Sequence, residues 1–129
     1  MQELMQITRA ADARTTATPN AVMTTLASPT QGGTEHLSLW KVEMAAGHRG
    51  PLHVFDHEQA WTVLTGEATV TIDGIATTLG AGDTVVIPAG AQRQIEAAAD
   101  LSAIVTGGAG SVVRVPGEDA PRGTPPWVA

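Results

Sequence analysis

The sequence predicts an all-β domain in which short antiparallel strands form a sandwich or a barrel. From Val22 onward, apolar stretches rich in Val, Ile, Leu and Thr alternate with Gly and Pro at intervals of roughly 8–12 residues, which is typical of such folds. Asp73-Gly74 lies between two alternating stretches and is a strong signal for a two-residue hairpin turn. No stretch has the apolar period of a long helix.

The expected strands follow the apolar stretches in order along the chain. They are residues 22–26, 37–44, 59–64, 68–72, 75–79, 84–87, 93–96, 101–106 and 112–115. The strands on either side of Asp73-Gly74 form the hairpin, because both turn residues tolerate a positive φ. We expect one compact domain, since 129 residues can hold a single core without disulfide bonds.

The two ends of the chain differ from the barrel, which we assign to residues 22–115. Residues 1–21 are polar and Thr-rich, and they form either a short helix near residues 3–13 or an N-terminal arm or swapped strand on a neighbouring subunit. Residues 116–129 carry four prolines, which exclude a central strand and predict an extended Pro-rich strap.

Composition and charge narrow the classes of function. The net charge of −6, with only 7 basic residues, argues against a nucleic acid partner. No apolar run is long enough to span a membrane, and the N-terminus lacks the pattern of a secretory signal, so we expect a cytoplasmic protein with no membrane partner. Because the chain contains no Cys, its chemistry comes from oxygen and nitrogen groups.

Two segments carry glycines, prolines and polar residues at a recurrent spacing. The first places Gly47, His53, Gln59 and Gly66 in the pattern Gly, five residues, His-x-His, three or four residues, Glu or Gln, six residues, Gly. The second is 82–90, which reads Gly, five residues, Pro-x-Gly. The pair resembles the two motifs of the cupin superfamily. The resemblance implies a double-stranded β-helix, or jelly-roll barrel, of two antiparallel sheets.

The four positions that bind a metal in this superfamily are largely changed here. His53 is retained, but Phe55, Gln59 and Arg93 stand at the other three. Phenylalanine has no donor atom and a guanidinium is always a cation, so we expect no metal cofactor. The alternative is a zinc or iron site rebuilt from His53, His57 and Gln59, since three protein ligands are enough for an open catalytic site.

The same residues predict an aromatic pocket for a small-molecule ligand. Strand alternation places Gln59 and Trp61 on one face, and Trp40 also points inward beside Phe55. A pocket that is mainly apolar with a few polar groups is typical of small-molecule sites. The competing interpretation of Trp40 and Trp61 is core packing alone.

Two polar residues of this pocket are candidates for catalysis. His53 is a candidate general acid or base, since the ordinary pKa of histidine lies near working pH. Arg93 is a candidate clamp for a carboxylate, phenolate or enolate. The competing interpretation of Arg93 is a surface ion pair with an acidic residue at the barrel rim, for which the candidates are Glu96, Glu67 and Asp83.

Three functions are compatible with these residues. The first is a metal-independent enzyme of the cyclase, isomerase or lyase type that transfers a proton on a planar anionic metabolite. The second is a metal-dependent cupin, and the third is a non-catalytic ligand-binding or sensor cupin. Because a barrel of two sheets leaves exposed edges, we also expect a homodimer.

Overall fold

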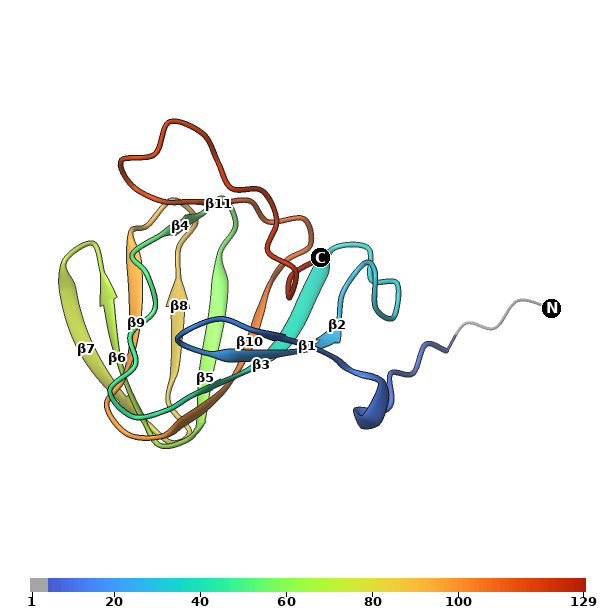
Figure 1. The fold of residues 1–129 in the computed structure, drawn as a ribbon, viewed down its shortest axis with the longest axis horizontal. Coiled ribbons are helices and arrows are strands. Elements are labelled where there is room, and N and C mark those ends of the chain that lie inside the picture. Colours follow the sequence, from blue (N-terminus) through green and yellow to red (C-terminus); the bar gives the residue numbers. More distant parts are fainter. Residues whose placement is uncertain (1–4) are drawn as a thin grey trace.

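The computed structural model describes residues 5–129 and shows two antiparallel sheets that face each other (Figure 1). One sheet has six strands in the order β1-β2-β3-β10-β5-β8, and the other has three in the order β7-β6-β9. The larger sheet consists of β1 (Arg14–Ala17), β2 (Val22–Ala27), β3 (Leu37–Met44), β10 (Leu101–Gly108), β5 (Gln59–Thr65) and β8 (Thr84–Ile87). The smaller sheet consists of β7 (Ile75–Gly80), β6 (Glu67–Ile72) and β9 (Arg93–Ala97). The predicted all-β, jelly-roll class is confirmed.

The core lies between the sheets because the strands alternate buried and exposed residues. On β3, Trp40, Val42 and Met44 are buried, whereas their neighbours along the strand face outward. β5 and β9 repeat the pattern, with Trp61 and Ile95 among the buried side chains. This period of two is what a sheet with one face on the core requires. The alternation therefore sets which side chains point into the space between the sheets.

The Asp73-Gly74 hairpin forms as predicted. Asp73 has φ 47° and Gly74 has φ 85°, and β6 pairs with β7 from Ile72 and Ile75 outward. Positive φ at both central residues gives the turn a twist that matches the flanking strands. The hairpin fixes the register of the smaller sheet, whose β6 also pairs with β9.

Two strands lie outside the ranges that the apolar stretches predict. β1 (Arg14–Ala17) lies in the segment assigned to the N-terminal arm, and it pairs with β2 of the same chain. β4 (Val54–Phe55) pairs with β11 (Val113–Arg114) in a two-stranded ribbon at one end of the sandwich.

The short helix near residues 3–13 is represented only by one 3₁₀ turn, Ala10–Asp12, and residues 3–4 lie outside the described part. Within residues 5–129 no helix has the length and hydropathy that a membrane crossing requires. The homodimer stays a prediction.

The C-terminal strap is fastened along the larger sheet. The hydroxyl of Thr25 donates to the carbonyl oxygen of Trp127 at 3.0 Å. The hydroxyl of Ser38 donates to the carbonyl oxygen of Val128 at 2.6 Å. The Val128 side chain is fully buried in the core. These bonds hold the last residues beside β2 and β3, so that the strap passes over one end of the sandwich (Figure 1).

Gly66, the last glycine of the first motif, is required by a close approach between two loops. Its φ is +85°, and a Cβ atom at this position would overlap the carbonyl oxygen of Asp100. We expect Gly66→Ala to destabilise the protein by more than about 3 kcal/mol, because positive φ and a backbone clash act together. The measurement is urea unfolding followed by tryptophan fluorescence.

Gly47→Ala is the matched control for this prediction. Gly47 also has φ +85°, but no atom lies within 4 Å of the position that an alanine Cβ atom would take there. Only the conformational cost applies at this glycine, and it is about 1 kcal/mol. Equal unfolding midpoints for the two variants would contradict the clash.

Candidate functional site

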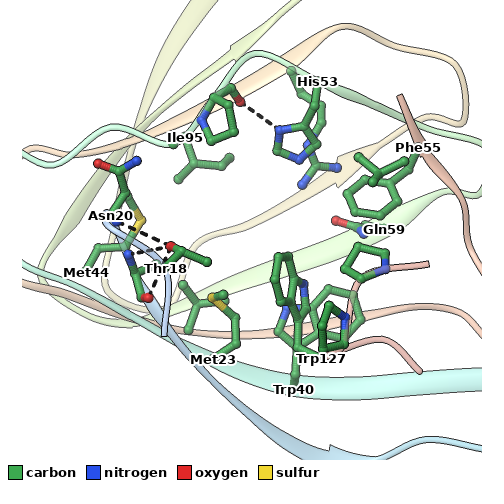
Figure 2. A pocket seen from close by; sticks show the side chains of 18 of the residues that line it. Thr18, Asn20, Met23, Trp40, Met44, His53, Phe55, Gln59, Ile95 and Trp127 are labelled. Atoms are coloured by element: carbon green, nitrogen blue, oxygen red, sulfur yellow. Dashed lines mark hydrogen bonds between the residues drawn. The ribbon is translucent and has the colours of Figure 1, made fainter. Parts of the chain in front are cut away.

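A cavity of about 530 Å³ opens between the two sheets at the end that the strap crosses. Most of its wall is apolar, with Trp40, Met23 and Met44 on one side and Phe55 and Ile95 on the other (Figure 2). Three polar side chains from the sequence motifs also line it, namely His53, Gln59 and Arg93. An apolar cavity with a few polar groups is the common form of a small-molecule site.

A β-bridge brings His53 and Arg93 together. The backbone N–H of His53 donates to the backbone carbonyl oxygen of Arg93 at 3.1 Å. The backbone N–H of Arg93 donates to the backbone carbonyl oxygen of His53 at 3.0 Å. Residues paired in this way lie directly opposite each other, with their side chains on the same face. The two motifs, separated by about forty residues of chain, therefore place a histidine and an arginine side by side in the cavity wall.

The guanidinium group of Arg93 is buried without a carboxylate partner. Arg93 is only 3% exposed, and its Nε has no hydrogen-bond partner within the described chain. Among residues 5–129 no carboxylate forms an ion pair with it, so the rim pairing with Glu96, Glu67 or Asp83 does not occur. Burial lowers the pKa of Arg93 to about 10, which leaves it charged at neutral pH.

Aromatic rings supply the surroundings that this charge does have. The guanidinium carbon of Arg93 lies 4.9 Å from the centre of the Phe55 ring and 5.9 Å from that of Trp61. Such contacts attract a cation by about 0.5–2 kcal/mol each. They offset only part of the cost of removing the charge from water, which is several kcal/mol. The cavity therefore holds a positive charge that is incompletely compensated.

The tautomer of His53 follows from its hydrogen bond. Its Nδ1 lies 2.7 Å from the carbonyl oxygen of Pro51, which can only accept, so Nδ1 carries the proton (Figure 2). Burial, and next the charge of Arg93, lower the pKa of His53 to about 4, although the bond to Pro51 acts to raise it. At neutral pH His53 is therefore uncharged, and its Nε2 has a free lone pair.

The other predicted pocket residues also line the cavity. Trp40, Phe55, Gln59 and Trp61 are all at least nine-tenths buried, and each faces this space. The ring of Phe55 meets the ring of His53 edge to face, with centroids 5.3 Å apart. Trp40 and Trp61 thus belong to the core and to the cavity wall at once, so that core packing and ligand contact are compatible for both residues.

His57 is not brought to this cavity. Its side chain is about half exposed, its Nδ1 lies 2.8 Å from Oδ1 of Asp56, and it lines a separate outer hollow with His36 and Glu58. The turn is held in this direction because the Asp56 carboxylate also accepts the N–H of Val112 at 2.7 Å. The set His53, His57 and Gln59 therefore does not converge on the central cavity.

Sequence reasoning missed two segments of the cavity wall. They are the turn between β1 and β2 (Thr18, Pro19, Asn20 and Ala21) and the strap (Arg122, Thr124, Pro125, Pro126 and Trp127). Figure 2 shows Thr18 and Asn20 at one side of the cavity and Trp127 at another. The only sequence signal is the lone Trp127 among prolines, because a large aromatic residue in an exposed tail tends to find apolar cover.

Comparison with known proteins agrees with this architecture. A family model described as "Cupin domain" matches residues 40–107, which is more than half of the chain. The chain belongs to the cupin family. No curated protein matches it.

Solved cupin-fold structures resemble most of the chain. An RmlC-like cupin from Shewanella frigidimarina has a TM-score of 0.70 at 22% identity, and the match covers 84% of this chain and 94% of that one. KdgF from Halomonas sp. has a TM-score of 0.70 at 20% identity, covering 81% and 93%. A protein described as a putative sugar phosphate isomerase from Acidithiobacillus ferrooxidans has a TM-score of 0.66 at 22% identity. That match covers 85% of this chain and 80% of the other. At these identities the likeness shows the fold alone.

The four ligand positions of the cupin motifs do not fit a metal cation in this chain. Phe55 offers no donor atom, and the Oε1 of Gln59 already accepts the indole N–H of Trp61 at 3.1 Å. At the fourth position the charged guanidinium of Arg93 occupies the wall of the same cavity and would repel a cation. That leaves Nε2 of His53 and the second lone pair of the Gln59 Oε1, which are fewer ligand atoms than the three protein ligands of an open metal site. The donor set of this cupin is instead suited to an anion.

Proposed function

We propose that this cupin binds a small planar anion in its central cavity and transfers a proton on it, without a metal ion. The reaction class is that of a cyclase, isomerase or lyase that acts next to a carbonyl group. The observation that carries the proposal is the buried guanidinium of Arg93, which has no carboxylate partner within residues 5–129 and lines the cavity. Arg93 binds the anion and His53 moves the proton.

An anionic ligand would supply what Arg93 lacks. A carboxylate can accept two parallel N–H bonds from a guanidinium, and such charge-assisted bonds are among the strongest in proteins. Because most of the cavity wall is apolar and Arg93 is buried in it, this attraction is weakened less than at a surface. Trp40 and Trp61 line the same cavity and offer flat apolar faces for a planar ligand.

His53 is arranged to act as a base. Its Nε2 has a free lone pair, because the proton is held on Nδ1 by the carbonyl oxygen of Pro51. In the proposed step, Nε2 takes a proton from a carbon next to the ligand's carbonyl group. The C–H electron pair forms the carbon–carbon double bond of an enolate, and the π pair of the C=O bond moves to its oxygen. Nearby N–H donors stabilise the developing negative charge, and return of the proton to another position completes the isomerisation.

A second candidate function is ligand binding without turnover. The low pKa of His53, about 4, favours it, because a weakly basic imidazole removes protons slowly. A bound carboxylate would cancel the charge of Arg93 and raise this pKa, which favours catalysis. The two candidates share the same ligand class and differ only in whether the bound molecule changes.

The test uses phenylpyruvate, a carboxylate with an acidic methylene group next to a carbonyl. We expect the protein to bind it and to accelerate exchange of its methylene protons in D₂O, followed by NMR. His53→Gln should slow the protein-dependent exchange by at least about 100-fold, which is the ordinary scale of general base catalysis. His48→Gln, which changes an exposed histidine outside the cavity, is the matched control and should exchange like the parent protein.

The outcomes separate the two candidates. Binding with exchange no faster than in buffer would support the binding protein and remove the role of His53 in catalysis. Absence of binding at millimolar concentration, for phenylpyruvate and for 3-phenylpropionate alike, would overturn the proposed function as a whole.

A further inference from the structure

The amide of Gln59 has a fixed orientation. The residue is 1% exposed and lines the cavity, and its Oε1 lies 3.1 Å from the indole Nε1 of Trp61. An indole N–H can only donate, so the atom of Gln59 that faces it must be the carbonyl oxygen. The other end of the amide, Nε2 with its two N–H groups, has no hydrogen-bond partner within the described chain.

The backbone around Gln59 keeps its side chain in this place. Gln59 and Trp61 are two residues apart on β5, so their side chains lie on the same face. Across the sheet Gln59 pairs with Gly107, where a Cβ atom would come within 3.1 Å of Cγ of Gln59 and 3.4 Å of the Trp40 ring. The glycine therefore leaves room for both side chains, with Cγ of Gln59 beside Gly107 and its amide oxygen on the Trp61 indole.

A buried amide donor without a partner is costly, and in a binding site it indicates a missing acceptor. The polar groups of the cavity form a set with complementary roles. Arg93 and Gln59 carry N–H donors, and Nε2 of His53 is the one basic nitrogen among these three side chains. A carboxylate held by two parallel N–H bonds directs both of its oxygens at Arg93, and a further acceptor beside it would pair the Gln59 amide.

We propose that Gln59 selects ligands that carry a second acceptor oxygen beside the anionic group, as a 2-oxo acid does, and that Trp61 is the positioning residue that holds its amide in the donor orientation. The inference rests on the proposed function, since it takes the anion to lie on Arg93. The keto oxygen would accept the Gln59 N–H, and the adjacent carbon would face His53. When His53 removes a proton from that carbon, the C–H electron pair forms a carbon–carbon double bond and the C=O π pair moves to the keto oxygen. The negative charge of the enolate then develops on the atom that accepts the Gln59 N–H.

The test compares two probes with the same skeleton. Phenylpyruvate has the 2-oxo oxygen and 3-phenylpropionate lacks it, and the readout is the ratio of their dissociation constants from calorimetry. We expect the parent protein to prefer phenylpyruvate by about tenfold, which is the scale of one well-placed hydrogen bond. In Gln59→Met, which keeps the shape but removes the donor, the ratio should fall to near 1.

Two further variants make the test specific. Trp61→Phe removes the indole N–H contact to the amide, and the ratio should fall by about threefold, whereas a loss of packing alone would weaken both probes equally. Gln94→Met is the matched control, because the amide of Gln94 donates to the carbonyl oxygen of Gly50 at 3.0 Å and does not line the cavity. Its ratio should equal that of the parent.

Failure of this inference differs from failure of the proposed function. If the parent protein binds both probes equally, the donor role of Gln59 is wrong and the anion site at Arg93 stands. If Gln59→Met keeps the tenfold preference, another group contacts the keto oxygen and the inference is likewise overturned. If neither probe binds, the proposed function itself fails.

Discussion

Replacing Arg93 with methionine should make the protein more stable and at the same time abolish anion binding. Arg93 is 3% exposed, and its charged side chain has no carboxylate partner within residues 5–129. Exchanging a buried charge for an apolar side chain of similar length removes its desolvation cost, and comparable replacements stabilise proteins by about 1–4 kcal/mol. The lost contacts with Phe55 and Trp61 reduce this gain, so we expect about 1–2 kcal/mol.

The same substitution removes the group that holds the anion. We expect the dissociation constant for 3-phenylpropionate to rise by at least about 100-fold, which corresponds to the loss of about 2.7 kcal/mol of binding free energy. Urea unfolding gives the stability and calorimetry gives the affinity. Arg114→Met is the matched control, since Arg114 is exposed on β11 and lies outside the cavity.

This pair of effects distinguishes a functional arginine from a structural one. A structural arginine would lose stability on replacement, because its partners would be left unpaired. A residue whose removal stabilises the fold is retained at a cost in stability, and buried charges of this kind are typical of functional sites. An Arg93→Met variant that unfolds more easily than the parent would mean that the guanidinium has a stabilising partner after all.

The strands that could be predicted are those with one buried face. In β3, β5 and β10 buried residues alternate with less buried ones, because one side of each strand packs on the core, and each strand contains enough apolar residues to be recognised in the sequence. β1 gives no such signal, since Arg14–Ala17 is a polar edge strand that is never deeply buried. β4 is two residues long, and no periodic pattern can identify a strand of that length. Its pairing with β11 is known only from the folded chain.

Part of the cavity lining could be predicted from the sequence, but the charge partners and hydrogen bonds of those residues could not. Motif spacing placed His53, Gln59 and Arg93 in one cavity, since strand positions fix which side chains face inward. That Arg93 lacks a carboxylate depends on where Glu96, Glu67 and Asp83 lie in three dimensions. The outward direction of His57 depends on the bond from Val112 to Asp56, two residues 56 positions apart in the chain. Contacts of that range leave no mark on local sequence.

Acid should destabilise this protein in a window that His53 defines. Its folded pKa is about 4, below its ordinary value of 6.5, so the unfolded chain takes up a proton between these pH values and the folded chain does not. The contribution of the uncharged His53 to the free energy of unfolding is therefore fully present above pH 6.5 and is lost as the pH falls towards 4. Because the side chain is partly exposed, we expect the loss to be on the order of 2 kcal/mol. His53→Gln should flatten the pH dependence of the unfolding free energy over this window.

The pKa of His53 should also depend on whether the charge of Arg93 is cancelled. Burial is the largest cause of its low pKa and the charge of Arg93 is the next, so cancelling that charge should raise the pKa part of the way from 4 towards 6.5. We expect the rise both in Arg93→Met and in the parent protein saturated with 3-phenylpropionate. The measurement is an NMR titration of the His53 ring carbons, with His36 and His48, which are exposed and outside the cavity, as internal references. A pKa that stays at about 4 in both samples would mean that the charge of Arg93 does not affect His53. The imidazole would then remain too weak a base at neutral pH for the proposed proton transfer.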